Sequence, residues 1–509
     1  MSIKNKILDV QKLSQFRKKN PNKKIVLCHG VFDLLHVGHI NYFKSAKKNG
    51  EVLVVSITHD KFVNKGPGRP AFKIENRVNF LKEIECVDFI FISNHPTAEK
   101  IIKNLKPHFY CKGSDYPINN IKKDLNLKKE IDALRSINGK FKVIQEPTFS
   151  SSKFINDNSL QNLSTECKDF IKLIRNQFSF TEVLESVKKV RNKKVLIIGE
   201  TIIDKYITTE AIGKSGKEPM LVIKPKKEIN FLGGSAYIAN LCSSFTNNIK
   251  IQSFLGDQRA EKKFILRNLN KNIKHDFLIK KNSPTINKLR YIDDYRKTKI
   301  IGVYDLNDDL ITKGEENKFY KILKKNISKY DIIIVADYGH GIITKKIRDL
   351  IIKNSSKIFL NTQINSFNRG YHTVFNYKKI NTLVINESEL RYELRDRSSV
   401  VSILANKLAK KISLQNIIIT RGRTGAIIIN KKNNLSISCP AFNRINKDTI
   451  GAGDTFFALS SLLIGAKIDF KISILIASIA ASFSIDQISA EQKIFNSKTL
   501  EKYLSHILK

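Results

Sequence analysis

The sequence predicts an α/β protein with two doubly wound parallel-sheet domains, and three observations carry that prediction. The chain has 509 residues, more than one hydrophobic core usually supports. Short apolar runs alternate with helical segments in two separate series, as in parallel strands joined by helices. Between the two series the polarity rises and strand signals vanish. We therefore expect one domain over residues 1–155, a helical linker over 156–192 and a second domain over 193–509.

The strands expected in the first domain are short and apolar, as buried parallel strands are. Segments of helical period lie between successive strands from the first to the fourth, and one more, Lys6–Lys18, precedes the first strand. Ligands of an open parallel sheet sit at the carboxyl ends of its strands, so the polar residues there form the candidate site. The expected strands are Ile25–Cys28, Glu51–Ile57, Asp88–Ile92, His108–Lys112 and Phe141–Ile144.

The stretch from Lys24 to His39 holds the first candidate site. An apolar strand leads to Gly30, where the backbone can turn, and a helical period begins at Asp33. His36 and His39 lie three residues apart, so they share one face of the first helical turn. Backbone N–H groups, the helix dipole and imidazole donors can together bind a phosphate there, although a lone histidine pair at this spacing is more often structural.

Further motifs follow this stretch in order. They are the basic loop Lys65-Gly-Pro-Gly-Arg69, Arg77 in a helix, Gly113-Ser-Asp115 after the fourth strand, and the cluster Ser150-Ser-Ser-Lys153. Together with Gly30–His39 this series resembles the cytidylyltransferase-like nucleotidyltransferases. The resemblance implies a Rossmann-like fold. The nucleotide- or phosphate-binding residues that it implies are Gly30, Phe32, Asp33, Lys65, Arg69, Arg77, Gly113, Asp115, Ser151 and Ser152.

The same resemblance implies catalytic roles. His36 and His39 would stabilise charge that builds on the α-phosphate during in-line attack, and Lys65 and Lys153 would neutralise the leaving group. One departure concerns that leaving group: many members carry an arginine just before the serine cluster, where this chain has Pro147-Thr148-Phe149. Which group covers the pyrophosphate is left open.

The second domain opens with an apolar strand, Lys194–Gly199, followed by Asp204. Gly233-Gly234 then precedes a helix with an inward amide, Asn240, and Gly451-Ala452-Gly453-Asp454 predicts a turn that begins another helix. Phosphoryl transfer needs positioning and charge stabilisation more than covalent help. A carboxylate beside an anion site can accept a hydroxyl proton, so Asp454 is the catalytic candidate of this domain.

Three other motifs each follow an expected strand. They are Asp337-Tyr-Gly-His-Gly341, Asn386-Glu-Ser-Glu389 and Thr420-Arg-Gly422. With the glycine motifs they resemble the ribokinase-like (PfkB) sugar kinases from about residue 190 onward. The resemblance implies that Asp454 is the base, and that Glu389 acts indirectly on Mg²⁺. The implied nucleotide-binding residues are Gly451, Ala452, Gly453, Asn386, Glu389, Thr420 and Gly422. The implied sugar-binding residues are Asp204, Gly233, Gly234, Asn240, Lys288 and Arg290.

Two positions depart from that kinase pattern. Glu200 stands where relatives usually carry Asp, and Asn361-Thr-Gln replaces a more usual Asp-Pro. Both departures are expected to alter the choice of sugar.

The pairing of the two domains resembles the bifunctional enzymes of ADP-heptose synthesis, with the domain order reversed. The resemblance implies a kinase that uses ATP and Mg²⁺ on a heptose-like sugar. It also implies nucleotidyl transfer from ATP or CTP to a sugar 1-phosphate. A sheet flap at Leu221–Phe231 could pair subunits, so a homodimer is left open.

The composition of the chain limits which kinds of binding partner are expected. The formal net charge of +42 could indicate nucleic acid or a membrane, but the lysines are spread through both halves without an arginine-rich block, as biased composition would produce. Six cysteines without a C-x-x-C pair fit a reducing cytosol. The apolar region around Ile472–Ile485 is too short to span a membrane and predicts a buried helix. We expect a cytoplasmic protein with small-molecule partners, and neither nucleic acid nor membrane.

Three alternatives remain at this point. The substrates could be glycerol or another polyol phosphate with CTP, because the motifs are shared. An aminoacyl-tRNA synthetase also has a His-x-Gly-His motif, but the region between the motifs is too small for a tRNA-recognition insert. A non-catalytic nucleic-acid binder would use the positive charge alone.

Overall fold

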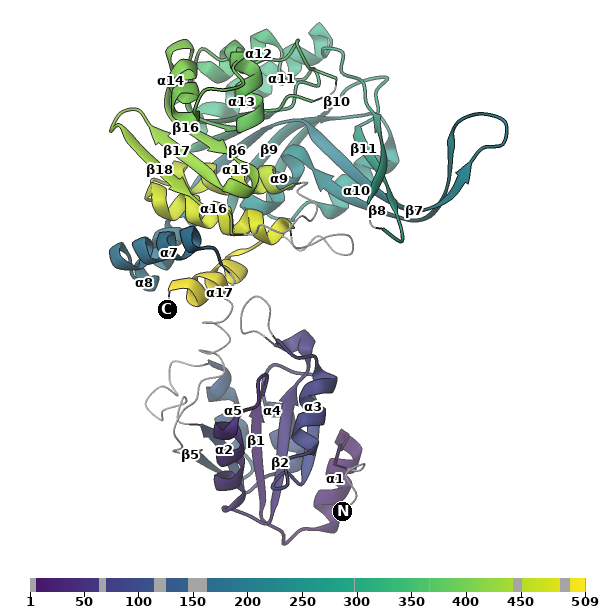
Figure 1. The fold of residues 1–509 in the computed structure, drawn as a ribbon, viewed down its shortest axis with the longest axis vertical. Coiled ribbons are helices and arrows are strands. Elements are labelled where there is room, and N and C mark those ends of the chain that lie inside the picture. The colour runs from purple at the N-terminus through teal and green to yellow at the C-terminus, as the bar shows by residue number, and fades with distance from the viewer. Residues whose placement is uncertain are drawn as a thin grey trace. The chain divides into compact units, whose positions relative to one another are not determined.

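The structure is a computed structural model that describes residues 6–63, 70–113, 125–144, 163–296, 298–365, 367–442, 451–485 and 495–508. The chain divides into two compact units, Met1–Asn162 and Leu163–Lys509 (Figure 1). The expected linker helices are α7 (Thr165–Gln177) and α8 (Phe180–Lys188). Both pack against α17 (Ser497–Leu508), so they belong to the C-terminal unit rather than to a separate linker.

The N-terminal unit is built on a five-stranded parallel sheet of order β3-β2-β1-β4-β5. Its strands are β1 (Ile25–Gly30), β2 (Val52–Thr58), β3 (Phe89–Ser93), β4 (Phe109–Gly113) and β5 (Lys140–Ile144). Its helices are α1 (Val10–Lys19), α2 (Val37–Lys47), α3 (Ile74–Lys82), α4 (Glu99–Leu105) and α5 (Leu125–Arg135). Alternate residues of β1 enter two different cores: Val26 packs with Phe43 of α2, whereas Ile25 packs with Leu13 of α1. Both faces are therefore covered, as expected for a doubly wound sheet.

The C-terminal unit contains a nine-stranded sheet of order β10-β9-β6-β13-β14-β15-β16-β17-β18. Its strands are β6 (Lys194–Gly199), β9 (Asn248–Leu255), β10 (Ile273–Ile279), β13 (Ile332–Asp337), β14 (Ile358–Thr362), β15 (Lys379–Asn386), β16 (Ser413–Thr420), β17 (Ala426–Asn430) and β18 (Leu435–Cys439). The pairs from β10 to β16 are parallel, but β17 and β18 are antiparallel. The segment between β16 and β17, residues 421–425, is too short for a parallel crossover, so the expected parallel sheet becomes antiparallel at this edge.

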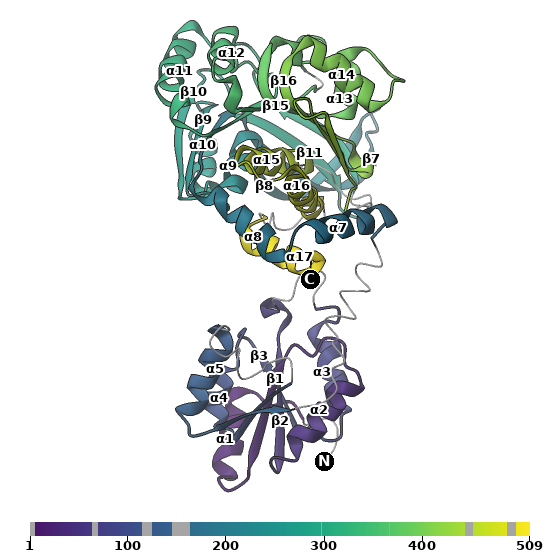
Figure 2. The same cartoon turned by 90° about the vertical axis from the view of Figure 1, so that its left-hand side faces the viewer.

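Helices cover both faces of this sheet (Figure 2). They are α9 (Gly234–Ser243), α10 (Arg259–Asn268), α11 (Lys313–Asn326), α12 (Lys345–Ile352), α13 (Glu387–Leu394), α14 (Val401–Lys411), α15 (Ala452–Gly465) and α16 (Phe470–Ile485). Leu196 and Val335 pack into a core with Phe319 of α11 and Leu404 of α14, whereas α15 contacts α9 and β13. The apolar region near residue 472 is α16, a buried helix as expected.

A second, four-stranded sheet has the order β12-β11-β7-β8. Its strands are β7 (Thr201–Lys214), β8 (Leu221–Gly233), β11 (Ile286–Asp293) and β12 (Lys299–Asp305). The flap expected at Leu221–Phe231 is β8, which pairs antiparallel with β7. In Figure 1 this β7–β8 hairpin projects from the C-terminal unit.

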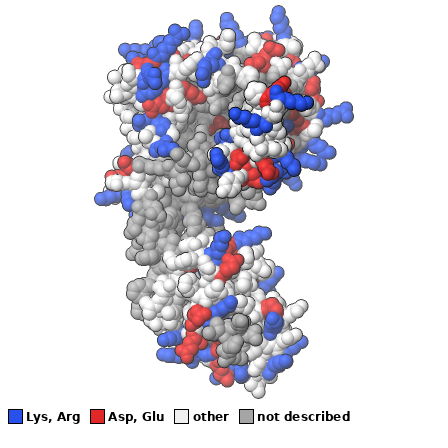
Figure 3. All heavy atoms as spheres, turned by 45° about the vertical axis from the view of Figure 1, so that its right-hand side comes forward, with Lys and Arg blue, Asp and Glu red and all other residues white. Residues whose placement is uncertain are grey.

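Charged side chains of both signs are interspersed on the face drawn in Figure 3. Blue Lys and Arg spheres stand beside red Asp and Glu spheres on this face, in keeping with lysines spread along the sequence. Within the part of the chain that the structure describes, no helix is both long and apolar enough to cross a membrane.

Candidate active sites

The candidate site of the N-terminal unit lies where the strand order of its sheet reverses, between β1 and β4. Ligands of doubly wound sheets bind outside the carboxyl ends of the strands at this point. Gly30 ends β1 and Gly113 ends β4, so the topology brings these two predicted residues to one edge. No atom lies within 4 Å of a Cβ built on Gly113, so among the described residues its surroundings are open.

His36 and His39 stand at the start of α2. His36 is the N-cap, and the backbone N–H of Gly38 donates to its Nδ1 at 3.1 Å. The helix begins at Val37 and not at Asp33, because a residue that caps a helix with its side chain keeps an extended backbone. The two imidazole centroids are 4.1 Å apart, so the expected pair does converge on one place.

Phe32 and Asp33 shape the turn that leads to these histidines. Phe32 has a positive φ of 48° and a buried ring that lies 5.8 Å from the His39 ring. Asp33 is buried and accepts the backbone N–H groups of Ala71 and Phe72 at 2.9 and 3.0 Å. Its carboxylate therefore joins the turn after β1 to the segment before α3. A direct nucleotide contact by either residue stays a prediction.

Arg77 was expected to reach the nucleotide, and the structure places it in the protein interior. Its guanidinium is fully buried and donates to the carbonyl oxygens of Val31, Thr58 and Phe72 at 2.5 to 3.0 Å. It also pairs with Asp60 at 2.5 Å. Arg77 thus joins the ends of β1 and β2 to α3, and its role as a nucleotide contact stays a prediction.

One buried ion pair near this site escaped the sequence analysis. Lys112, the penultimate residue of β4, donates to the carbonyl of His29 at 3.2 Å and lies 3.6 Å from Glu130 of α5. Tyr110 donates to the same Glu130 carboxylate at 2.8 Å. Helix α5 itself was not predicted, although Leu127, Ile131 and Leu134 carry its helical period. Six predicted residues, Lys65, Arg69, Asp115, Ser151, Ser152 and Lys153, lie outside the described residues.

In the C-terminal unit the strand order reverses between β6 and β13, and Asp454 lies close to the end of β13. Gly451 is the N-cap of α15 with a positive φ of 79°, and as a glycine it makes no side-chain capping hydrogen bond. A Cβ on Gly451 or Gly453 would meet no described atom within 4 Å. Glycine at these two positions keeps side-chain bulk away from the start of α15, so the N–H groups of its first turn are candidate donors to an anion.

Asp454 stands in the first turn of α15. Tyr338, the residue after β13, donates its hydroxyl to Asp454 Oδ1 at 2.8 Å. Burial raises the pKa of Asp454 to about 6, with Asp204 acting in the same direction, while the Tyr338 hydroxyl and Lys288 act against the rise. A carboxylate with a pKa near 6 is ionised at neutral pH and can still take a proton.

Four of the six predicted sugar residues lie on the four-stranded sheet, namely Asp204, Gly233, Lys288 and Arg290. Asp204 of β7 and Arg290 of β11 form an ion pair at 2.5 Å, with 17% and 12% of their side chains exposed. Lys288 of β11 is buried, and burial lowers the pKa of its amine, although Asp204 and Asp454 favour the charged form. Its ammonium lies 6.0 Å from the Tyr338 ring centroid. The sheet thus brings two cations and one carboxylate towards Asp454.

Gly233 and Gly234 permit close approaches at the start of α9. A Cβ on Gly233 would lie 2.3 Å from Asp204 Oδ2, and one on Gly234 would lie 2.4 Å from the carbonyl of Glu200. Asn240 is placed differently, because its side chain donates to the carbonyl of Asn268 and accepts from the backbone N–H of Asn270. A sugar contact by Asn240 stays a prediction.

The predicted nucleotide residues other than those at the start of α15 lie at or just after the ends of β15 and β16. Asn386 caps α13 in a capping box with Glu389, whose carboxylate also accepts the N–H of Ile364 at 3.3 Å. Burial raises the pKa of Glu389 to about 7. Thr420 ends β16, and Gly422 follows in a turn with a positive φ of 54°. Their nucleotide contacts stay predictions.

Glu389 is also the residue predicted to act on Mg²⁺. The described residues contain no cluster of three His, Cys, Asp or Glu side chains suited to a metal. A single carboxylate fits Mg²⁺ that keeps its waters and is held chiefly by substrate phosphates. Glu389 would hold such an ion only indirectly, and the ion would neutralise phosphate charge.

Glu200, the departure from the kinase pattern, is buried at the end of β6. Its two carboxylate oxygens accept the backbone N–H groups of Tyr338 and His340 at 2.9 and 3.1 Å. Burial and the neighbouring Asp337 raise its pKa to about 8. Glu200 therefore holds the loop after β13, a role that sequence alone did not suggest.

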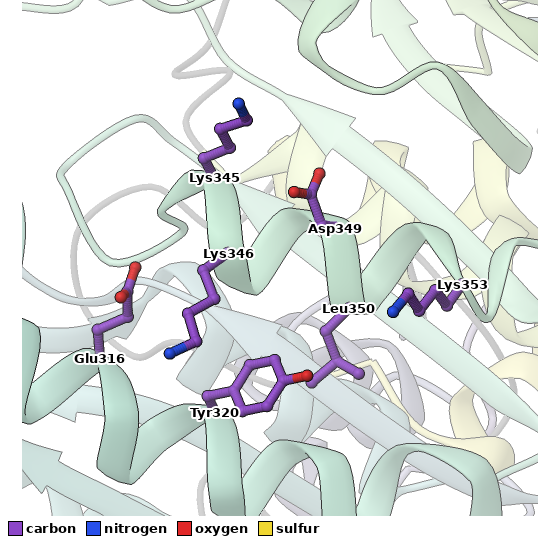
Figure 4. A pocket seen from close by; sticks show the side chains of 7 residues that line it. All are labelled: Glu316, Tyr320, Lys345, Lys346, Asp349, Leu350 and Lys353. Atoms are coloured by element: carbon purple, nitrogen blue, oxygen red, sulfur yellow. The ribbon is translucent and has the colours of Figure 1, made fainter.

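Two hollows lie apart from the predicted residues. A surface hollow of about 360 Å³ lies between α11 and α12 (Figure 4). It is lined by Glu316, Tyr320, Lys345, Lys346, Asp349, Leu350 and Lys353. A smaller cavity of about 20 Å³, roughly the room one water needs, is bordered by Glu200, Lys280 and His340.

A parallel sheet with a glycine-capped helix start and a carboxylate beside it suits an α/β enzyme that transfers a phosphoryl group, because this reaction needs charge stabilisation and positioning. Comparison with known proteins agrees with this class. Residues 192–494 match the pfkB family of carbohydrate kinases, and residues 27–212 match the cytidylyltransferase-like family. Since the first match spans more than half of the 509 residues, the chain belongs to the pfkB carbohydrate kinase family.

Among known proteins, the bifunctional protein HldE of Aliarcobacter butzleri is 27% identical over 311 residues, which cover 59% of this chain and 62% of that protein. The bifunctional protein HldE of Sulfurimonas denitrificans is 42% identical over 102 residues, or 20% of this chain and 21% of that protein. The chain thus spans less than two thirds of the length of these relatives. The ribokinase of Thermotoga maritima aligns with a TM-score of 0.49 at 16% identity, covering 62% of this chain and 99% of that structure.

Proposed function

We propose that the chain is a bifunctional enzyme of nucleotide-sugar synthesis. Its C-terminal unit phosphorylates a sugar with ATP, and its N-terminal unit transfers a nucleotidyl group from a nucleoside triphosphate to a sugar 1-phosphate. The observation that carries this proposal is a pair of helix starts, at α2 and at α15, each of which holds a motif predicted to bind phosphate. The two family matches and the relatives that bear the name bifunctional support it.

In the kinase unit, Asp454 accepts the proton of the sugar hydroxyl while the N–H groups at Gly451–Gly453 stabilise the transferred phosphoryl group. Lys288 and Arg290 bind the sugar or a phosphate on it, and Asp204 orients Arg290 through their ion pair. Mg²⁺ with ATP supplies charge neutralisation at the phosphates.

In the transferase unit, His36 and His39 stabilise charge on the α-phosphate as the sugar phosphate attacks and pyrophosphate leaves. The close imidazole centroids and the adjacent helix start support this assignment. The triphosphate is ATP or CTP.

The sugar we propose is heptose-like, and the domain order is reversed relative to the ADP-heptose enzymes that the chain resembles. The name HldE among the relatives supports this choice. We further propose a cytoplasmic enzyme whose partners are small molecules, and whose β7–β8 hairpin pairs two copies into a homodimer.

A ³¹P NMR screen tests the proposal. The full chain is mixed with Mg²⁺, ATP or CTP, and a panel of heptoses, heptose phosphates and polyol phosphates. We expect ADP and a new sugar phosphate from the kinase unit, and pyrophosphate with a heptose 1-phosphate from the transferase unit. A folded protein that is silent with every sugar phosphate would refute the transferase half, and turnover with polyol phosphates alone would refute the heptose assignment.

A further inference from the structure

Tyr338 contacts the carboxylate proposed as the kinase base. Its side chain is 1% exposed, and its hydroxyl donates to Asp454 Oδ1 at 2.8 Å. Burial and the Asp454 charge raise the pKa of this phenol well above its usual value, so the hydroxyl keeps its proton and remains a donor. One carboxylate oxygen of Asp454 is therefore fixed by a buried neutral group.

The position of Tyr338 is itself fixed at several points. Its backbone N–H donates to Glu200 at 2.9 Å. Its carbonyl accepts the side-chain amides of Asn365 and Asn368 at 3.0 and 2.7 Å. The Lys288 ammonium lies 6.0 Å from the ring centroid. The backbone is held on both sides and the ring is buried, so the hydroxyl has little freedom to move with Asp454.

The geometry points to Tyr338 as a positioning residue of the kinase reaction, which holds Asp454 so that its second oxygen, Oδ2, faces the sugar hydroxyl. This inference rests on the proposed function. In the step concerned, a bond forms between the sugar oxygen and the γ-phosphorus, and the bond from that phosphorus to the β,γ-bridging oxygen breaks. ADP leaves with the electron pair, and the hydroxyl proton passes to Asp454.

Glu200 acts one step further away. Both of its oxygens accept N–H groups of the loop after β13, so it fixes Tyr338, which in turn fixes Asp454. The change from Asp to Glu at this position therefore affects the positioning of Asp454 as well as the choice of sugar.

The charged and titratable groups around Asp454 come from several elements. They are Tyr338 after β13, Asp204 on β7, Lys288 on β11 and Glu389 on α13. Tyr237 on α9 shares a hydrogen bond with Thr455 instead. Of these groups, Tyr338 donates a hydrogen bond to the carboxylate, which favours its charged form. Removing that donor should raise the pKa of Asp454.

The test compares Tyr338→Phe with Tyr377→Phe. Tyr377 is also fully buried, but its hydroxyl donates to Asp337 at 2.6 Å, so the control loses the same kind of bond without touching Asp454. With the sugar found in the ³¹P screen, we expect Tyr338→Phe to lower kcat by roughly tenfold to a hundredfold, the range for one hydrogen bond to a charged group. The KM should change little. The acid limb of the pH profile should move to higher pH, while Tyr377→Phe leaves that limb in place.

A second variant covers the case in which Tyr338→Phe does not fold. Tyr338→3-fluorotyrosine keeps the ring and the hydroxyl but is a stronger donor, so the acid limb should move to lower pH. Wild-type kcat and an unmoved acid limb in the folded variants would overturn the inference. Asp454→Asn in the same assay separates the two proposals. If Asp454→Asn retains turnover, the assignment of Asp454 as the base fails. If Asp454→Asn is inactive while the Tyr338 variants have wild-type kinetics, only the positioning role of Tyr338 fails.

Discussion

Gly233→Ala tests the proposed sugar site through a steric clash, because the added methyl group would contact Asp204. A Cβ there would lie 2.3 Å from Asp204 Oδ2, about 1.1 Å inside the 3.4 Å of ordinary contact. The carboxylate is the flexible end of its side chain, so it can swing away and the fold survives. It would then leave Arg290, its partner at 2.5 Å.

The two consequences differ in size. Loss of one hydrogen bond between charged groups should lower the free energy of unfolding by about 1.5–3 kcal/mol. A displacement of about 1 Å in a substrate-positioning group can cost roughly 100-fold in turnover, so kcat/KM for the sugar should fall by about that factor. Chemical denaturation and kinase kinetics measure the two effects separately.

Gly216→Ala is the matched control, because a Cβ at Gly216 in the same hairpin meets no described atom within 4 Å. It should change neither stability nor turnover. If Gly233→Ala behaves like Gly216→Ala in the kinase assay, Asp204 and Arg290 do not position the substrate, and the sugar site lies elsewhere.

Three further predictions follow from single contacts. His36→Asn keeps an N-cap acceptor for α2, so it should lose nucleotidyl transfer at an unchanged melting temperature. His36→Ala removes that acceptor and should also destabilise the N-terminal unit by about 1 kcal/mol; equal melting temperatures of the two variants would contradict the capping role of His36. Arg77→Ala removes the donor from three carbonyl groups and the cation from Asp60, which is 30% exposed and still accepts the N–H of Ile74. Urea denaturation of the N-terminal unit should therefore show a loss of about 1–3 kcal/mol, and an unchanged free energy of unfolding would contradict its structural role. Asp454 must be ionised to take a proton, and its pKa is about 6. The kinase kcat/KM should therefore fall as the pH drops through that value, and a flat profile from pH 5 to 8 would contradict the role of Asp454 as the base.

Much of the fold followed from the sequence, because buried parallel strands are apolar runs that need no knowledge of their neighbours. The helix α5 was missed, and with it Glu130, whose partners Tyr110 and Lys112 lie on β4. Such a pair joins residues 18 and 20 positions apart, and no local pattern records it. The antiparallel edge at β17 was missed for a different reason: strand direction depends on the length of the connecting turn, and the start of β17 was not predicted.

Where a motif holds several functional groups together, as at His36–His39 and Gly451–Asp454, the structure keeps the groups at one helix start, and their ligand contacts stay predictions. Single residues were harder to interpret. Arg77 and Asn240 were expected to bind ligands, and both make several hydrogen bonds to backbone groups inside the fold. Tyr338 lies within the motif Asp337–Gly341 but received no role of its own, because its partner Asp454 lies 116 positions further along the chain.

The central claim is that two independent phosphate sites on one chain carry two reactions. The most direct measurement is ³¹P NMR of Asp454→Asn beside the wild-type protein, with both substrate mixtures. We predict that phosphorylation of the sugar disappears while pyrophosphate release by nucleotidyl transfer continues at the wild-type rate. Loss of both reactions in a folded variant, or survival of phosphorylation, would contradict the account.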